Sequence, residues 1–230
     1  MDQLHTALEN AGFERTKLPI SKPLVVHAVA GAGKSTLLRN FTAACPEALA
    51  QTCGPADPPN LEQTHIREHF GPQSNKINIL DEYPLLEPLR GAWAAVFADP
   101  LQYSTGALPP HYVKKTSHRL GVHTAQLISK LICPVSSSST KPDSVTFSGI
   151  FEGQLLGQII ALDDLTASLL ARHSVPFACP EQVRSQEFPE VTVVSASPLD
   201  KVINKSLLYV ALSRHTEKLH VLSPPPHPSS

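Results

Sequence analysis

Several features that would place the chain in a common class are missing from its 230 residues. Its four cysteines, at positions 45, 53, 133 and 179, are too widely spaced for a disulfide framework and suit free thiols in a reducing compartment. The 11 histidines are scattered, without an H-E-x-x-H motif, so we expect no metal site built from histidine and cysteine. Lysine and arginine number 19 against 20 aspartate and glutamate, so no bulk positive charge indicates a nucleic-acid partner. Any such contact would have to depend on a local patch.

Long apolar segments are also missing. No window approaches the roughly 18 consecutive apolar residues of a membrane-spanning helix. The N-terminal sequence MDQLHTALENAGFERT carries acidic residues and lacks the apolar core of a signal peptide. We therefore expect a soluble protein of the cytoplasm without a membrane span.

Short apolar runs that alternate with helical stretches predict an α/β protein with parallel sheets. The expected strands are residues 23–29, 76–80, 94–98, 157–162, 191–195 and 218–222. Leu4, Leu8 and Ala11 keep helical spacing and predict a short N-terminal helix that Gly12 ends. Two α/β domains, residues 1–115 and 116–222, suit this number of strands better than a single sheet. We expect residues 134–144, PVSSSSTKPDS, to form a surface loop and residues 223–230 to form a disordered or polyproline tail.

The sequence HAVAGAGKSTLL lies between an apolar run and a helical stretch, which predicts a phosphate-binding loop. Small residues let successive backbone N–H groups point at one anion, and the N-terminus of the following helix adds its positive dipole end. The pattern G-x-x-x-x-G-K-[ST] is met except at its first position, which is Ala28. Lys34 would contact the β- and γ-phosphates of ATP, and Ser35 would bind Mg²⁺. The predicted nucleotide-binding residues are Ala28, Gly31, Ala32, Gly33, Lys34, Ser35 and Thr36. The alternative interpretation is a glycine-containing turn with a solvated lysine.

Acidic residues follow the next apolar run in KINILDEYP. The carboxyl ends of strands are where open α/β sheets bind their ligands. Asp81 would hold Mg²⁺, and Glu82 would orient or deprotonate the attacking water, which implies ATP hydrolysis. Gln102, after the next run, would hydrogen-bond the γ-phosphate or the water. Two solvated acids and an ordinary loop glutamine are the alternative interpretations.

The order of motifs GAGKST, LDEYP, ADPLQ, TSHRLG, QEFPEVTVV and YVALSRH resembles that of superfamily 1 helicases over residues 23–222. Together with the small size and the sequence GFERT, it resembles the family of movement proteins encoded first in the triple gene block of potexviruses and related plant viruses. The resemblance implies two RecA-like P-loop NTPase domains. It also implies that Arg119 and Arg214, from the second domain, reach the γ-phosphate and act in catalysis with Lys34, Glu82 and Gln102. A surface ion pair is the alternative interpretation for each arginine.

The residues expected to contact RNA are less clearly marked. Gln51 and Thr52 lie where the first domain of such a helicase would touch the RNA backbone. Helicases of this type commonly carry a Gln-Gly pair before the strand VTVV, where this chain has Arg184 and Ser185. Arg184 and Gln186 are therefore candidate RNA-binding residues at a motif that departs from the pattern.

The resemblance implies an RNA-binding ATPase that uses Mg²⁺, assists the movement of viral RNA between plant cells and suppresses host RNA silencing. The implied partners are single-stranded viral RNA, other viral movement proteins, coat protein, host silencing proteins and a second copy of the chain. One alternative is a non-enzymatic scaffold with a vestigial ATPase site. Another is a small-molecule kinase, which would leave VALSRH without a role.

Overall fold

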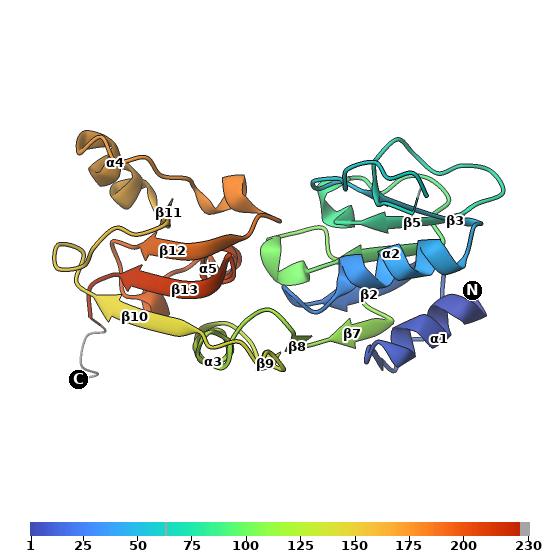
Figure 1. Ribbon diagram of the computed structural model, residues 1–230, viewed down its shortest axis with the longest axis horizontal. Helices are drawn as coiled ribbons and strands as arrows, with labels where there is room; N and C mark the ends of the chain where they lie inside the picture. Colours follow the sequence, from blue (N-terminus) through green and yellow to red (C-terminus); the bar gives the residue numbers. More distant parts are fainter. Residues whose placement is uncertain (63, 226–230) are drawn as a thin grey trace. The chain divides into compact units, whose positions relative to one another are not determined.

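The computed structural model describes residues 1–62 and 64–225. The chain divides into two compact units, Met1–Lys115 and Thr116–Ser230, and each unit is built around its own sheet (Figure 1). The predicted α/β class with parallel sheets is confirmed. The RecA-like character of the two units stays a prediction. Of the predicted C-terminal tail, residues 226–230 lie outside the described residues.

Unit 1 has a seven-stranded sheet with the strand order β1-β7-β2-β6-β5-β3-β4. Neighbouring strands run parallel, except that β1 is antiparallel to β7. The strands are β1 (Glu14–Arg15), β2 (Leu24–Ala28), β3 (Ala48–Thr52), β4 (Arg67–Glu68), β5 (Ile77–Asp81), β6 (Ala95–Ala98) and β7 (Tyr112–Lys114). The helices are α1 (Asp2–Asn10) and α2 (Lys34–Ala44), with the 3-10 turns η1 (Tyr83–Leu85) and η2 (Pro100–Gln102). Three of the strands, β2, β5 and β6, and both helices were predicted from the sequence.

The core of unit 1 lies at its central strands. Every residue of β2 and β6 is buried, as expected for strands covered on both faces of a parallel sheet. Val26 of β2 is paired with Phe97 of β6 on one side and with Tyr112 of β7 on the other. Since parallel strands end at the same edge, the loops after β2, β5 and β6 meet at the carboxyl edge of this sheet.

Unit 2 has a four-stranded parallel sheet with the order β10-β13-β12-β11, and a separate pair, β8 and β9. The strands are β8 (Thr116–Ser117), β9 (Ser136–Ser137), β10 (Ser144–Ser148), β11 (Gln158–Ala161), β12 (Phe188–Val194) and β13 (His215–Leu222). The helices are α3 (Val122–Leu131), α4 (Asp164–Arg172) and α5 (Lys205–Leu212), with the 3-10 turns η3 (Pro180–Val183) and η4 (Leu199–Lys201). Strands β11, β12 and β13 match predicted strands.

The prediction of a plain surface loop at residues 134–144 is wrong in part. Ser136 and Ser137 form β9 and pair with β8, and Ser144 begins β10. The side chain of Asp143 is almost fully buried and accepts hydrogen bonds from the first turn of α3. The hydroxyls of Ser137 and Ser138 donate to backbone carbonyls, so this serine-rich segment is anchored by hydrogen bonds as well as by the buried Val135.

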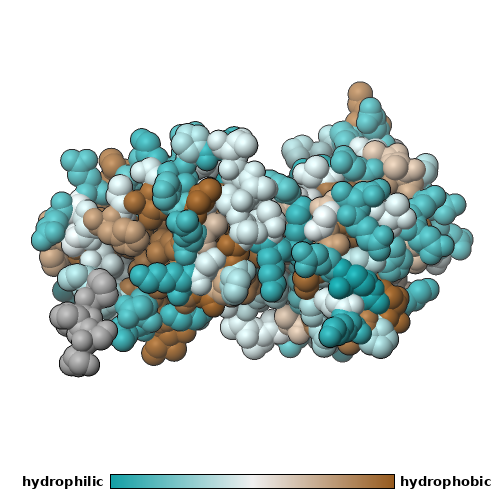
Figure 2. Space-filling view, turned by 90° about the horizontal axis from the view of Figure 1, so that it is seen from below, coloured by the Kyte–Doolittle hydropathy of each residue, from teal (hydrophilic) through white to brown (hydrophobic). Residues whose placement is uncertain are grey.

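Polar and hydrophobic residues are mixed on the face of the molecule drawn in Figure 2. Figure 2 shows hydrophilic residues over much of one face, with hydrophobic residues in several groups among them. Among the described residues, no helix combines the length and the apolar character that crossing a membrane requires.

Candidate nucleotide site

The loop between β2 and α2 has the backbone of a phosphate-binding loop. Gly31 and Gly33 have φ values of 72° and 92°, which residues with a Cβ rarely adopt. Ala32 turns back to donate a hydrogen bond to the carbonyl of Val29 (3.1 Å). Ala28, at the first motif position, is the last residue of β2 and is buried. The departure from glycine at this position is therefore accommodated, because Ala28 still belongs to the strand.

Helix α2 begins directly behind this loop at Lys34, with Gly33 as its N-cap and no side chain capping it. The first N–H groups of a helix have no partner within the helix and favour an anion. Lys34 is nearly buried and places a positive charge at the same helix end. Ser35 is half-buried, and Thr36 is exposed on the first turn. A helix end of this kind can bind phosphate groups.

Two acidic residues lie at the carboxyl edge of the sheet, Asp81 as the last residue of β5 and Glu82 directly after it, and both are buried. Glu82 has a φ of 53°, a left-handed conformation that is strained for a residue with a side chain and is often found at functional sites. Tyr103 donates a hydrogen bond of 2.6 Å from its hydroxyl to Oε2 of Glu82. The backbone and Tyr103 together therefore fix the Glu82 carboxylate.

The environment of Asp81 suits a divalent cation. Its Oδ1 atom is buried and has no hydrogen-bond partner among the described residues. Burial, and then the negative charge of Glu82, raise the pKa of Asp81, while the charge of Lys34 opposes this shift. Carboxylate and hydroxyl oxygens are the protein ligands that Mg²⁺ prefers, so Asp81 and Ser35 fit this ion. Within the described ranges, no group of three or more His, Cys, Asp or Glu side chains could hold a metal by itself, so such an ion would share its ligands with phosphates.

Gln102 follows β6, the strand between β2 and β5. Its Nε2 donates a hydrogen bond of 3.0 Å to Oδ2 of the fully buried Asp99. Its Oε1 is buried and lacks a hydrogen-bond partner in the described part of the chain. The structure thus brings Lys34, Asp81 and Gln102 to neighbouring strand ends within unit 1.

Sequence reasoning missed two residues at this site. Tyr103 directly follows Gln102 in the motif ADPLQY, which was the only available signal for it. His27 of β2 lies with Nε2 2.9 Å from the hydroxyl of Tyr83. Burial and the charge of Lys34 lower the pKa of His27 to about 4, so the ring is neutral beneath the phosphate-binding loop.

The predicted arginines lie close together within unit 2. Arg119 pairs with Glu187 and donates a hydrogen bond of 3.0 Å to the carbonyl of Ser213. Arg214 is buried and donates to Oγ of Ser213 (2.8 Å) and to the carbonyl of Gln186 (3.4 Å). Their roles in catalysis stay predictions.

The residues expected to contact RNA differ in exposure. Gln51 is fully buried, and its amide bonds the backbone of residues 70 and 71 through three hydrogen bonds. Thr52 is also buried and accepts a hydrogen bond from the N–H of Gly54. This geometry gives Gln51 a structural task, and the RNA contacts of Gln51 and Thr52 stay predictions. Gln186 is exposed and Arg184 half-buried, and both stay predictions.

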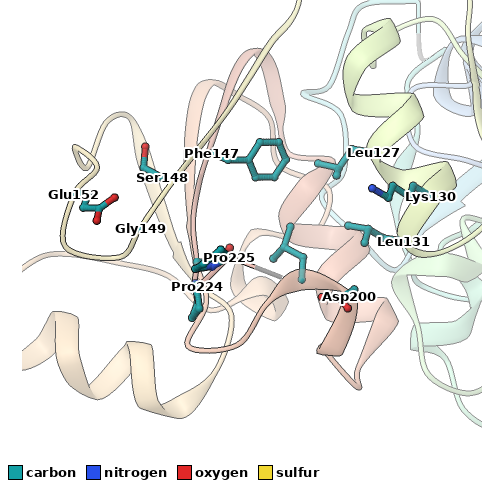
Figure 3. Close-up of a pocket in the computed structure, with 12 residues that line it drawn as sticks. Leu127, Lys130, Leu131, Phe147, Ser148, Gly149, Glu152, Asp200, Pro224 and Pro225 are labelled. Carbon is teal, nitrogen blue, oxygen red and sulfur yellow. The ribbon is translucent and has the colours of Figure 1, made fainter. Parts of the chain in front are cut away.

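A separate cavity of about 690 Å³ lies in unit 2 at the carboxyl ends of β10 and β13. Figure 3 shows Phe147 of β10 pointing toward Leu127 of α3 across this cavity. Arg214 precedes β13, whereas Ser223, which lines the cavity, follows its end. The eight residues of β13 extend over roughly 25 Å. The cavity is therefore distinct from the predicted arginine cluster.

Unit 1 is an α/β unit in which a glycine-containing loop joins the buried strand β2 to the N-terminus of α2. A family profile for the viral superfamily 1 RNA helicase core domain matches residues 24–223. The movement and silencing protein TGBp1 of Plantago asiatica mosaic potexvirus is 55% identical over 229 residues, covering 100% of both chains. TGBp1 of papaya mosaic potexvirus is 49% identical, covering 100% of this chain and 99% of the relative. TGBp1 of Potato virus X (strain CP) is 40% identical, covering 93% and 95%. The chain belongs to the family of TGBp1 movement and silencing proteins.

Solved helicases share the fold. An arterivirus nonstructural protein 10 (helicase) in complex with DNA matches with a TM-score of 0.59 at 15% identity, covering 95% of this chain. A second structure of an arterivirus nonstructural protein 10 has a TM-score of 0.54 and covers 95%. This chain spans only 62% of the length of the first helicase. At such identity the similarity concerns the fold alone.

Proposed function

We propose that the protein is a Mg²⁺-dependent ATPase that acts on viral RNA. The observation that carries this proposal is the juxtaposition, within unit 1, of an uncapped helix N-terminus with two buried carboxylates, one of which has an oxygen without a partner among the described residues. A scaffold requires neither feature, and a buried unpaired carboxylate destabilises a protein unless a ligand satisfies it.

The chemistry proposed for the site is hydrolysis of the γ-phosphoryl group. Backbone N–H groups at the start of α2 and the ammonium of Lys34 would bind the phosphates. Ser35 and Asp81 would hold Mg²⁺, which supplies positive charge to the phosphate oxygens when bound. Glu82, held by Tyr103, would accept a hydrogen bond from the water that attacks the γ-phosphorus and receive its proton. The bond from the γ-phosphorus to the β,γ-bridging oxygen breaks, and ADP and phosphate leave.

The catalytic roles of Arg119 and Arg214 belong to the same proposal. Arginine side chains that meet the transferred phosphoryl group stabilise the charge of the transition state. The two residues already share Ser213 as a hydrogen-bond partner within unit 2. We propose that they supply this charge during turnover.

The biological role is proposed from the relatives, which are named movement and silencing proteins. We propose that the protein assists movement of single-stranded viral RNA and suppresses silencing in the host cytoplasm, together with coat protein, other movement proteins and host silencing proteins. The net charge of −1 requires a local basic surface for RNA, so affinity should fall steeply as salt rises. RNA titrations at several salt concentrations measure this, and an affinity independent of salt would contradict it.

Phosphate release by the full chain, with Mg²⁺ and ATP and with or without single-stranded RNA, tests the proposed activity. Glu82→Gln should retain binding of a fluorescent ATP analogue but lose about 100-fold or more in turnover. Lys34→Ala should lose both binding and turnover. Glu87→Gln is the matched control, because Glu87 is exposed in the same segment. A wild-type protein without turnover, with or without RNA, would overturn the proposal in favour of the scaffold.

A further inference from the structure

A buried chain of hydrogen bonds in unit 2 leads from the segment before β10 to the start of β13. The carboxylate of Asp143 accepts from the backbone N–H of Thr124 (2.8 Å) and from its hydroxyl (2.9 Å). The same hydroxyl oxygen lies 2.8 Å from Nε2 of His215. Because the single hydroxyl hydrogen of Thr124 is donated to Asp143, Nε2 of His215 must carry a hydrogen and donate it. The chain therefore fixes both the orientation and the tautomer of the His215 ring.

The N-terminus of α3 is shaped to receive Asp143. A Cβ at Gly121, the N-cap of α3, would lie only 2.1 Å from Cγ of Asp143, so a larger residue would displace the carboxylate. His123 donates two further hydrogen bonds to Asp143 Oδ1, from its backbone N–H and from its ring Nδ1. Burial alone would raise the pKa of Asp143, but the hydrogen bonds from Thr124 and His123 outweigh it and lower the pKa. Asp143 is therefore an ionised acceptor, which strengthens each bond in the chain.

The segment that this chain reaches contains Arg214. On the other side of that arginine, Ser213 is bonded through its carbonyl to Arg119. The carbonyl of Arg214 itself accepts a hydrogen bond of 2.9 Å from the N–H of Phe188. These bonds hold the backbone, whereas the bond between Thr124 and His215 holds the side chain that directly follows Arg214. Thr124 and His215 are both buried, so water cannot replace that bond.

We propose that Thr124 and Asp143 are positioning residues that keep Arg214 in its working orientation. The inference rests on the proposed ATPase and deepens it. Thr124 and Asp143 act through His215 and touch no substrate. Loss of the hydroxyl at Thr124 leaves Nε2 of His215 without its partner and lets residues 213–215 shift. A misplacement of about 1 Å in a catalytic group can reduce turnover by roughly 100-fold.

Thr124→Val tests this, because valine has the shape of threonine and lacks the hydroxyl. We expect kcat to fall about 10-fold or more while the nucleotide Kd changes less than about 2-fold, since the phosphate-binding loop is in unit 1. Thr124→Ser should restore turnover to near the wild-type value. The matched control is Thr166→Val. Thr166 is a buried threonine at the same position of α4, the third residue, and donates to the carbonyl of Asp163. This control should lose stability yet keep the kcat of its folded fraction.

Two further measurements separate the outcomes. Arg214→Ala reports on the proposed function, so unchanged turnover in this variant would overturn the role of Arg214 itself. Reduced turnover in Arg214→Ala with wild-type kcat in Thr124→Val would overturn only the positioning role. Nitrogen-15 NMR of the His215 ring in the wild-type protein provides a readout that does not depend on activity or on folding of a variant. A ring protonated on Nε2 supports the chain of bonds, and one protonated only on Nδ1 overturns it.

Discussion

Acid should destabilise unit 1 through His27. His27 is 7% exposed. The hydroxyl of Tyr83 accepts a hydrogen bond from the N–H of Leu108 (2.7 Å), which leaves the hydroxyl hydrogen free for donation to Nε2 of His27. Burial, and then the charge of Lys34, lower the pKa of His27 from 6.5 to about 4. Between these pH values the unfolded chain binds a proton that the folded chain does not. The contribution of the neutral His27 ring to the free energy of unfolding is therefore fully present above pH 6.5. It is lost as the pH falls toward 4, by about 3 kcal/mol in all.

The assay is urea unfolding at pH 7.5 and pH 4.5, followed by the fluorescence of Trp93. Trp93 is the single tryptophan and is buried in unit 1, so it reports on the unit that contains His27. The glutamine in His27→Gln can accept a hydrogen bond from the hydroxyl of Tyr83 but cannot be protonated. Between the two pH values, wild type should lose about 2.5 kcal/mol more than this variant. His173→Gln, at an exposed position, should behave as wild type. Equal losses in wild type and His27→Gln would refute the reasoning.

Two other variants test the catalytic arginine and a buried loop anchor. Arg214→Lys should lose about 10³ in turnover, because an ammonium cannot replace the planar fork of a guanidinium on phosphate oxygens. Steady-state ATPase beside nucleotide binding measures this, and near-wild-type turnover would contradict it. Asn78→Ala should lower the free energy of unfolding by about 2–3 kcal/mol, because Asn78 makes three hydrogen bonds to the backbone of Gln73 and Lys76. Urea unfolding with the exposed Asn40→Ala as control measures this, and equal stability of the two variants would contradict it.

The central strands of unit 1 could be predicted because buried strands consist of continuous runs of apolar residues. Strands β3 and β7 could not, since each contains a buried polar residue that interrupts the pattern. Gln51 in β3 is satisfied by the backbone of residues 70 and 71. Lys114 in β7 donates to the carbonyl of Ala11 (2.8 Å), and its Nζ lies 5.4 Å from the centre of the Phe13 ring. Both partners are distant in sequence, so the burial of these side chains depends on tertiary structure.

The same distinction applies to the candidate sites. Lys34 and Asp81 were recognised because each belongs to a local motif, at the start of a helix after β2 and at the end of β5. The contacts through which other residues hold site residues in place cannot be inferred from a local motif. Tyr103 bonds Glu82 across 21 positions, and Asp143 bonds Thr124 across 19. Asp143 also lies in a segment whose composition indicates a loop, so only the fold reveals that it caps α3.

The buried carboxylate of Asp81 should make the nucleotide site less stable without its ligand than a neutral site would be. Asp81→Asn removes one of two adjacent negative charges, and the remaining carboxylate of Glu82 can still offset the charge of Lys34. We therefore expect the ligand-free variant to be more stable than wild type by about 1–3 kcal/mol.

With Mg²⁺ and ADP the stability difference should shift in favour of wild type. The free energy of unfolding of wild type should rise by about 2.7 kcal/mol with Mg²⁺ and ADP at 100 times their Kd. For Asp81→Asn, ADP with Mg²⁺ should stabilise no more than ADP with EDTA. Urea unfolding followed by Trp93 fluorescence, with and without each ligand, measures both effects. Asp200→Asn is the control, because Asp200 is an exposed acid of unit 2. An Asp81→Asn protein that is less stable without ligand, yet responds to Mg²⁺ as wild type does, would show that Asp81 is a structural acid. A variant that is more stable than wild type without ligand and that does not respond to Mg²⁺ would place the metal at the Asp81 carboxylate. In that case the charge of the bound metal offsets the unfavourable burial of the acid.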